Sequence, residues 1–260
     1  MTRLNKFIAD SGLCSRREAD ALVAQGRVRV NGGAALTGTQ IGPDDKVEVD
    51  GRAIGQSRPA QAVYIAYHKP VGVVCTTDLR EPNNIVKAVD HSRRVFPVGR
   101  LDRDSEGLIF LTTDGDVVNK VLRAGNAHEK EYEVTLRRNF DETFLRRMSQ
   151  GVPILDTVTR PCRVTRLTGQ RFVIVLTQGL NRQIRRMCEH LGHEVRQLRR
   201  TRIMHIHLGR LGVGVWRNFT PIEVASLHRL VVASSKLAGK LAGKLAGVPG
   251  AETHDEDETD

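Results

Sequence analysis

In the first fifty residues the apolar positions follow a helical period and then a strand period. Ser15 and Glu18 have the spacing of a capping box, in which each side chain satisfies a backbone donor of the other residue. The Asn31-Gly32 pair is typical of a tight turn between strands. The pattern predicts a small helix-helix-strand module, with helices at residues 3–11 and 15–25 and strands at 28–30 and 47–49.

Residues 52–61 have no apolar period and contain both glycine and proline, which indicates a linker between two domains. We expect the first domain at residues 1–57, the linker at 58–61 and the second domain at 62–232.

The second domain mixes β-rich runs with helical runs and lacks a strict alternation of strand and helix. Such a mixture favours an α+β fold over a doubly wound α/β fold. Thr220 and Glu223 form a second capping box, with Pro221 in the first turn of the final helix. The other expected elements are strands at 63–67, 72–76, 108–112, 132–136, 163–167 and 172–177, and helices at 116–124, 141–150 and 181–191.

The C-terminal segment repeats Lys-Leu-Ala-Gly three times over residues 236–247 and then becomes acidic. Each glycine costs a helix about 1 kcal/mol relative to alanine. We therefore expect a disordered tail at 233–260, in preference to a lipid-binding amphipathic helix.

Composition narrows the class of protein. The 260 residues carry a formal charge of +10, and because the segment 233–260 contributes three lysines and six acids, residues 1–232 carry +13. Such an excess favours a polyanionic partner, nucleic acid above all, although a basic enzyme with solvated arginines would have the same charge. Nowhere do about 18 apolar residues run together, and the N-terminus lacks the apolar run of a secretory signal, so we expect a cytoplasmic protein without a membrane span.

Asp102 lies in a polar loop that is framed by Gly99 and Gly107 and leads directly into an apolar strand. Such a junction can direct a side chain into a site. Asp102, Asp104 and Glu106 weakly resemble a calcium loop, but the twelfth position is not glutamate and no helix follows. An aspartate that only caps the backbone amides of a turn remains an equally good interpretation.

The expected helix 181–191 places its apolar residues on one stripe. At about 100° per residue, Arg182 and Arg186 point away from the stripe, whereas Arg185 lies at its border and can reach inward. A partly buried guanidinium needs an acidic partner. The alternatives are a structural ion pair and a helix that only faces RNA.

Further arginines follow this helix directly, so that residues 182–202 contain seven arginines. This density favours a groove that follows phosphates over a scattered solvated surface. A metal site built on Cys188, His190, His193 and Glu194 is disfavoured, because the neighbours are cationic and a helix end separates these residues. Tyr132, between charged residues at the start of a strand, is either a hairpin side chain or a stacking platform for a base.

Together, these residues resemble the RsuA/RluB/RluF family of bacterial ribosomal RNA pseudouridine synthases. Within that family, their sequence is most similar to the RluF branch. Residues 1–57 look like the S4 RNA-binding domain and residues 62–232 like the catalytic domain. The three motifs that carry the resemblance are Gly99-Arg100-Leu101-Asp102-x-Asp104-Ser105-x-Gly107-Leu108, Lys130-x-Tyr132, and Asn181-Arg182-Gln183-Ile184-Arg185-Arg186-Met187.

The resemblance implies a mostly antiparallel sheet with helices on its faces, and an enzyme that converts uridine to pseudouridine without a cofactor or a metal. It implies Asp102 as the essential carboxylate, Tyr132 as the aromatic ring against the target uracil, and Arg185 as the partner of the Asp102 carboxylate. Asp102 would either attack C1′ or deprotonate the sugar, and an adjacent guanidinium favours an ionised carboxylate. Because C1′ is inaccessible in a base stack, the nucleotide should be flipped out.

The implied partners are 23S ribosomal RNA and a tyrosine tRNA, bound by a monomer. A non-catalytic S4-type RNA-binding protein that acts in ribosome assembly is the alternative, since it explains the charge equally well. The candidate RNA-binding residues are Arg3, Lys6, Arg16, Arg17, Arg27, Arg100, Arg103, Asn181, Arg182, Arg186, Arg199, Arg200 and Arg202.

Overall fold

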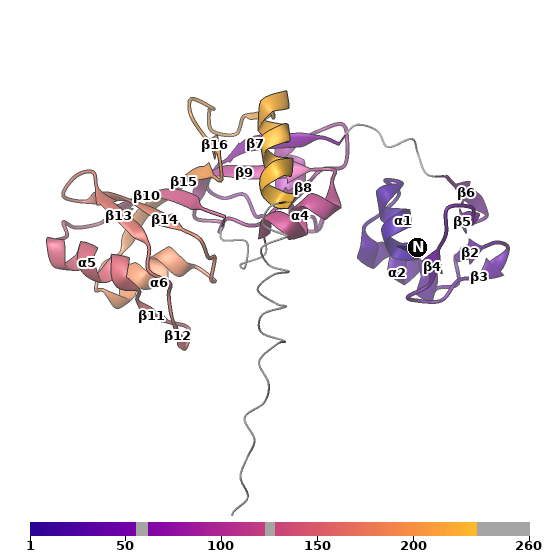
Figure 1. Ribbon diagram of the computed structural model, residues 1–260, viewed down its shortest axis with the longest axis horizontal. Helices are drawn as coiled ribbons and strands as arrows, with labels where there is room; N and C mark the ends of the chain where they lie inside the picture. The colour runs from indigo at the N-terminus through magenta and orange to yellow at the C-terminus, as the bar shows by residue number, and fades with distance from the viewer. Residues whose placement is uncertain (56–61, 123–127, 233–260) are drawn as a thin grey trace, which may run out of the picture. The chain divides into compact units, whose positions relative to one another are not determined.

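The computed structural model describes residues 1–55, 62–122 and 128–232, so the expected linker at 58–61 and the expected tail at 233–260 lie outside the described residues. The chain divides into two compact units, Met1–Ala62 and Val63–Asp260, which we treat separately. Figure 1 colours both along the chain. Within the described ranges, no helix is long and apolar enough to cross a membrane.

The N-terminal unit packs two helices against short strands, as its apolar pattern predicts. The capping box is formed: the Glu18 N–H donates to Ser15 Oγ, and the Ser15 N–H donates to the Glu18 carboxylate. One antiparallel sheet has the strand order β3-β2-β5-β6, and β1 pairs with β4. The elements are β1 (Thr2–Arg3), α1 (Leu4–Asp10), α2 (Arg16–Ala24), β2 (Val28–Val30), β3 (Gly33–Ala34), β4 (Gln40–Ile41), β5 (Val47–Val49) and β6 (Arg52–Ile54).

The second unit is built on one mixed sheet with the strand order β13-β14-β10-β15-β9-β7-β17, which confirms the expected α+β class. The pairings along this order are antiparallel except between β15 and β9, which run parallel. Residues 221–232 form a further helix. The strands and helices are β7 (Tyr64–Lys69), α3 (Ile85–Val89), β8 (Phe96–Val98), β9 (Glu106–Thr112), α4 (Gly115–Leu122), β10 (Lys130–Leu136), α5 (Glu142–Gln150), β11 (Pro153–Ile154), β12 (Thr157–Val158), β13 (Arg163–Arg166), β14 (Arg171–Leu176), α6 (Gln183–His190), β15 (Val195–Ile203), β16 (Ile206–His207) and β17 (Trp216–Asn218).

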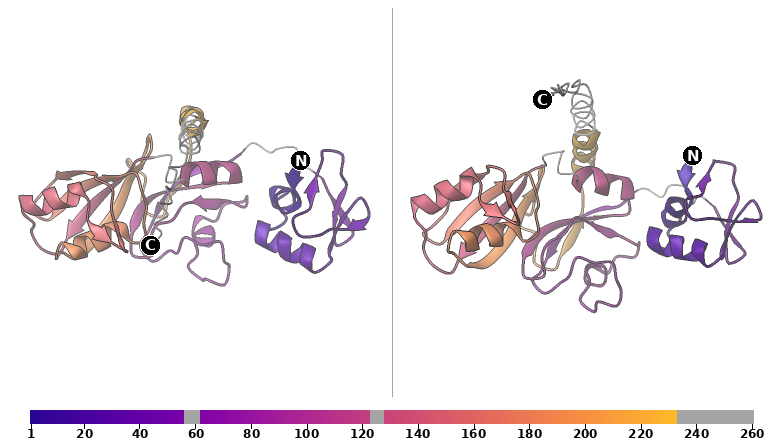
Figure 2. Two further views of the ribbon diagram at one scale, coloured as in Figure 1. Left: turned by 60° about the horizontal axis from the view of Figure 1, so that its bottom comes forward. Right: turned by 90° about the horizontal axis from the view of Figure 1, so that it is seen from below.

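Helices cover both ends of this sheet. One apolar cluster joins α5 and α6 to β10, β14 and β15, and a second joins α4 and the helix 221–232 to β7, β8 and β9. A third cluster packs α3 against the other face of β7 and β9. The views in Figure 2 show α5 and α6 side by side over one end of the sheet. Leu101, next to Asp102, packs in the third cluster, and Tyr132 packs against both the first and the third.

Two sequence-based expectations about strands were wrong. Residues 72–76 form no strand; Val74 makes only an isolated bridge to Asn84. The arginine-rich segment after α6, for which we expected a phosphate-tracking surface, is instead β15, a central strand of the sheet. Its charges hid the strand pattern; two of them are paired with glutamates of β10, Arg199 with Glu133 and Arg202 with Glu131.

Candidate active site

Asp102 lies on the loop between β8 and β9, and the rest of the protein holds this loop by its backbone. The Leu101 N–H donates to Cys75 Sγ at 3.3 Å, the Gly72 N–H donates to the Arg103 carbonyl at 2.7 Å, and the Ser105 N–H donates to the Asp102 carbonyl at 3.1 Å. The Asp102 side chain is 33% exposed. The loop therefore presents a solvent-accessible carboxylate from a fixed backbone.

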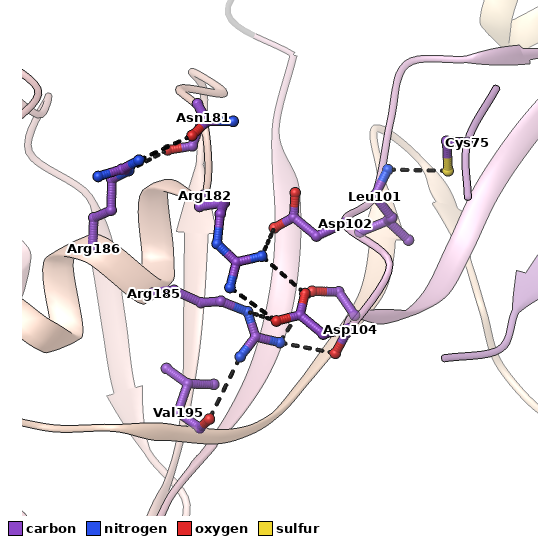
Figure 3. A network of polar contacts seen from close by, with 10 residues as sticks. Cys75, Leu101, Asp102, Asp104, Asn181, Arg182, Arg185, Arg186 and Val195 are labelled. Carbon is purple, nitrogen blue, oxygen red and sulfur yellow. Dashed lines mark hydrogen bonds and ion pairs between the residues drawn. The ribbon is translucent and has the colours of Figure 1, made fainter. Parts of the chain in front are cut away.

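Arg182 provides the first contact between α6 and this loop (Figure 3). Its guanidinium donates to both carboxylate oxygens of Asp104, at 3.1 and 2.9 Å, and lies 3.8 Å from Oδ2 of Asp102. Arg182 is the N-cap residue of α6. Its backbone φ is +50°, in the left-handed region that residues other than glycine rarely adopt. Such a conformation costs about 1–3 kcal/mol and is typical of functional sites.

Arg185 reaches inward from the border of the apolar stripe, as the helical period predicted, and its side chain is only 15% exposed. Its Nη2 donates to the Asp104 carbonyl at 2.9 Å and to Ser105 Oγ at 3.3 Å, and its Nε lies 3.3 Å from the Asp104 carboxylate. The expected ion pair with Asp102 is not formed: among the described residues, the carboxylate beside Arg185 belongs to Asp104. Because Arg185 binds the backbone at the β9 end of the loop, its guanidinium faces Asp104.

The two carboxylates of the loop differ in what holds them. The hydrogen bonds from Arg182 lower the pKa of Asp104, and the charge of Arg185 adds to the effect. Within the described residues, no hydrogen bond engages the Asp102 carboxylate, whose nearest cation is Arg182 at 3.8 Å. Asp104 thus orients the two arginines, whereas the oxygens of Asp102 accept no hydrogen bond within the described residues.

Tyr132 projects from β10 and is partly buried at the junction of two apolar clusters. The Cζ atom of Arg200 lies 5.9 Å from the centre of its ring. Arg200 is only 4% exposed, and it donates to the Leu108 carbonyl at 2.6 Å and to the Arg100 carbonyl at 3.4 Å. Arg200 therefore connects the Asp102 loop, β9 and the Tyr132 ring from inside the protein.

Lys69 is a buried charged residue that the sequence reasoning missed. It has no exposed surface, and its Nζ donates at 2.8 Å to the carbonyls of both Pro70 and Val73. Burial lowers its pKa, while Cys75, Asp104 and Asp102 act in the opposite direction. A lysine at the end of an apolar run, immediately before a proline, is the signal that could have identified it.

The other candidate RNA-binding residues fall into three groups. Arg200 and Arg202 face inward, contrary to expectation: Arg202 is 12% exposed and pairs with Glu129 and Glu131. Arg182 and Arg186 bind Asp104 and Asn181, and Lys6, Arg27 and Arg199 are held by Asp10, Asp50 and Glu133. The exposed side chains in the set include Arg3, Arg16, Arg17, Arg100, Arg103 and Asn181.

No group of three or more metal-ligating side chains comes together in the part of the chain that the structure describes. The residues around Asp102 are carboxylates and cations held by one another. They hold one accessible carboxylate on a fixed loop, and Arg200 links that loop to the Tyr132 ring.

Comparison with known proteins identifies a family for each of the two units. A family model described as RNA pseudouridylate synthase matches residues 63–190, and one described as the S4 domain matches residues 2–52. The chain is 55% identical over 233 residues to the dual-specificity RNA pseudouridine synthase RluF of Escherichia coli (strain K12), which covers 90% of this chain and 80% of that protein. It is 34% identical over 239 residues to ribosomal large subunit pseudouridine synthase B of Bacillus subtilis (strain 168), covering 88% of this chain and 97% of that relative.

A solved structure described as "Crystal structure of pseudouridylate synthase" aligns with a TM-score of 0.64 at 27% identity, and covers 87% of this chain and 100% of that chain. Family models, close relatives and a solved structure therefore agree on both units of the fold. The chain belongs to the RsuA/RluB/RluF family of RNA pseudouridine synthases, with an S4 domain ahead of the synthase domain.

Proposed function

We propose that this enzyme isomerises specific uridines in large-subunit ribosomal RNA and in a tyrosine tRNA, with Asp102 as the essential carboxylate and Tyr132 against the target uracil. One observation carries the assignment of Asp102: its carboxylate is accessible and bound by no hydrogen bond within the described residues, on a loop that Arg182 and Arg185 hold through Asp104. The word "dual-specificity" in the name of the Escherichia coli relative supports two classes of RNA substrate.

The reaction breaks the bond from N1 to C1′, turns the uracil within the site, and joins C5 to C1′. Asp102 either attacks C1′ as a nucleophile or stabilises the sugar and removes a proton from it; both roles need an ionised and accessible oxygen. Arg182 places a positive charge 3.8 Å from one of the Asp102 oxygens. The C5 proton leaves and N1 takes up a proton, so that the product is an isomer of the substrate and no oxidant, reductant or water is consumed.

Release of tritium from RNA that carries 5-tritiated uridine tests the function, because C5 loses its hydrogen only when the new bond forms. We expect release from 23S ribosomal RNA and from tyrosine tRNA, and mapping of modified sites in RNA from cells with and without the gene should identify the same positions. A wild-type protein that binds both RNAs but releases no tritium from either would instead support the non-catalytic S4-type RNA-binding protein.

For the remaining properties we propose a monomer that acts in the cytoplasm, where it would meet both RNAs. Sedimentation of the purified protein, alone and with a substrate RNA, measures its oligomeric state. An enzyme that sediments as a dimer and binds one RNA would contradict the proposed monomeric state.

Arg16 and Arg17, in the first turn of α2, are expected to contact the RNA backbone. Both are exposed, and in the described part of the chain neither has an acidic partner. Replacing both by glutamine should weaken RNA binding and lower the slope of log K against log salt by up to about 0.7 to 0.9 for each lost phosphate contact. Single-turnover rates at saturating enzyme should not change.

Arg52→Gln is the matched control, since Arg52 is an exposed arginine of the same unit on β6, beside Asp50. The slope measured by fluorescence anisotropy should change little for Arg52→Gln. Equal slopes for the double variant and the wild type would remove the α2 surface from the RNA footprint.

A further inference from the structure

Two cations share the surroundings of Tyr132. Lys130 and Tyr132 are two residues apart on β10 and so project from the same face of the sheet. Arg200, from the neighbouring strand β15, lies against the Tyr132 ring and is nearly completely buried. Across the β10–β15 pairing, Tyr132 is opposite Arg200 and Lys130 is opposite Ile203, so the two cations occupy neighbouring positions on adjacent strands.

Neither cation has an acidic partner within the described residues. The Nζ of Lys130 donates to the His128 carbonyl at 3.2 Å, and Arg200 donates to backbone carbonyls and has a buried Nη2 without a partner. The carboxylates on either side of Lys130 are engaged elsewhere, since Glu129 and Glu131 both pair with Arg202. Buried charges in proteins are nearly always paired. The surroundings of Tyr132 therefore carry an uncompensated positive charge.

The reaction supplies an anion at this place, if the uracil lies against Tyr132. When the bond from N1 to C1′ breaks, its electron pair remains on the uracil, and the charge spreads over the ring nitrogens and the carbonyl oxygens. A pair of ring electrons then forms the bond from C5 to C1′, the C5 proton departs, and N1 takes up a proton. We infer that Lys130 is a catalytic residue that stabilises the negative charge on the detached uracil, and that Arg200 is a positioning residue behind it. This inference rests on the proposed function.

Titration of Lys130 makes the inference testable. Burial lowers the pKa of Lys130 to about 8, and the charge of Arg200 contributes. Among the described residues, His128 is a titratable neighbour whose own pKa is lowered by burial and by Lys130. The residues paired with Lys130 on β14 and β15 are apolar, Leu176 and Ile203. Lys130 is therefore a cation below pH 8 and becomes neutral as the pH rises, so turnover should fall above pH 8.

The test compares Lys130→Met and Lys130→Arg with wild type by single-turnover tritium release between pH 6 and 10. The methionine variant should turn over about 100-fold more slowly at pH 7, the typical loss when one donor to a developing anion is removed. It should bind RNA normally. Because arginine keeps its charge, Lys130→Arg should recover most of that rate and show no decline above pH 8. Lys87→Met is the matched control, since Lys87 also donates to a backbone carbonyl but is exposed on α3.

Stability separates this role from a structural one. A lysine whose folded pKa is lowered from 10.5 destabilises the folded state while it is charged, and this penalty is lost as the pH rises from 8 to 10.5. At pH 7, Lys130→Met should therefore have a urea midpoint equal to or above that of the wild type.

Three outcomes would overturn the inference while the wild type remains active: a methionine variant within threefold of the wild-type rate, a destabilised methionine variant, or a decline above pH 8 that is the same in wild type and Lys130→Arg. The last would indicate ionisation of the pyrimidine itself. A wild type that is inactive on all RNAs would overturn the proposed function, and this inference with it.

Discussion

Replacing Asp102 by asparagine is expected to lower the rate of tritium release by at least about 1,000-fold, which corresponds to about 4 kcal/mol of activation free energy. Asparagine has the same shape, but its neutral amide neither attacks C1′ nor accepts a proton from the sugar. Because no hydrogen bond holds the Asp102 carboxylate within the described residues, and because the side chain is 33% exposed, the fold should not depend on its charge. The free energy of unfolding should change by less than about 0.5 kcal/mol.

Asp104→Asn is the matched control, since it removes the neighbouring carboxylate of the same loop. Arg182 and Arg185 both engage Asp104, so this variant should lose stability, by about 1 kcal/mol, and should lose less activity than Asp102→Asn. Single-turnover tritium release, RNA affinity and urea unfolding measure the three quantities. If Asp104→Asn were the more damaging variant for chemistry while both bound RNA, the roles assigned to the two carboxylates would have to be exchanged.

The second large effect is expected at Gly107, where β9 runs beside β15. Gly107 has a φ of +114°, and a Cβ atom there would lie 2.3 Å from the carbonyl oxygen of Arg200 and 2.5 Å from its nitrogen. These are backbone atoms, which cannot rotate away as a side chain could. Gly107→Ala should therefore separate the pair of strands that joins the two halves of the sheet and destabilise the protein by more than about 3 kcal/mol.

Gly72→Ala isolates the cost of the backbone conformation from the cost of the clash. Gly72 also has a positive φ, +94°, but no atom lies within 4 Å of the position that a Cβ atom would take. It should lose only about 1 kcal/mol. Thermal unfolding followed by circular dichroism compares the two variants, and limited proteolysis of the expressed protein replaces it if Gly107→Ala is insoluble. Equal melting temperatures for the two variants would contradict the proposed close approach.

The sequence by itself determined most of the local structure and the composition of the site. The capping boxes of Ser15 with Glu18 and of Thr220 with Glu223 are formed, because each depends on residues three positions apart. Helical spacing likewise predicted the inward reach of Arg185. The motifs that carry the family resemblance fall on the Asp102 loop, β10 and α6, and the comparisons confirm the family.

The tertiary structure decided which charges meet. An arginine-rich run became the central strand β15 because glutamates of β10, some 70 positions earlier in the chain, neutralise Arg199 and Arg202. Arg185 bonds to Asp104 and not to Asp102, and Arg200 lies inside the sheet against Tyr132. Local spacing fixes the direction of a side chain from its own helix or strand, whereas its electrostatic partner depends on long-range pairing of strands.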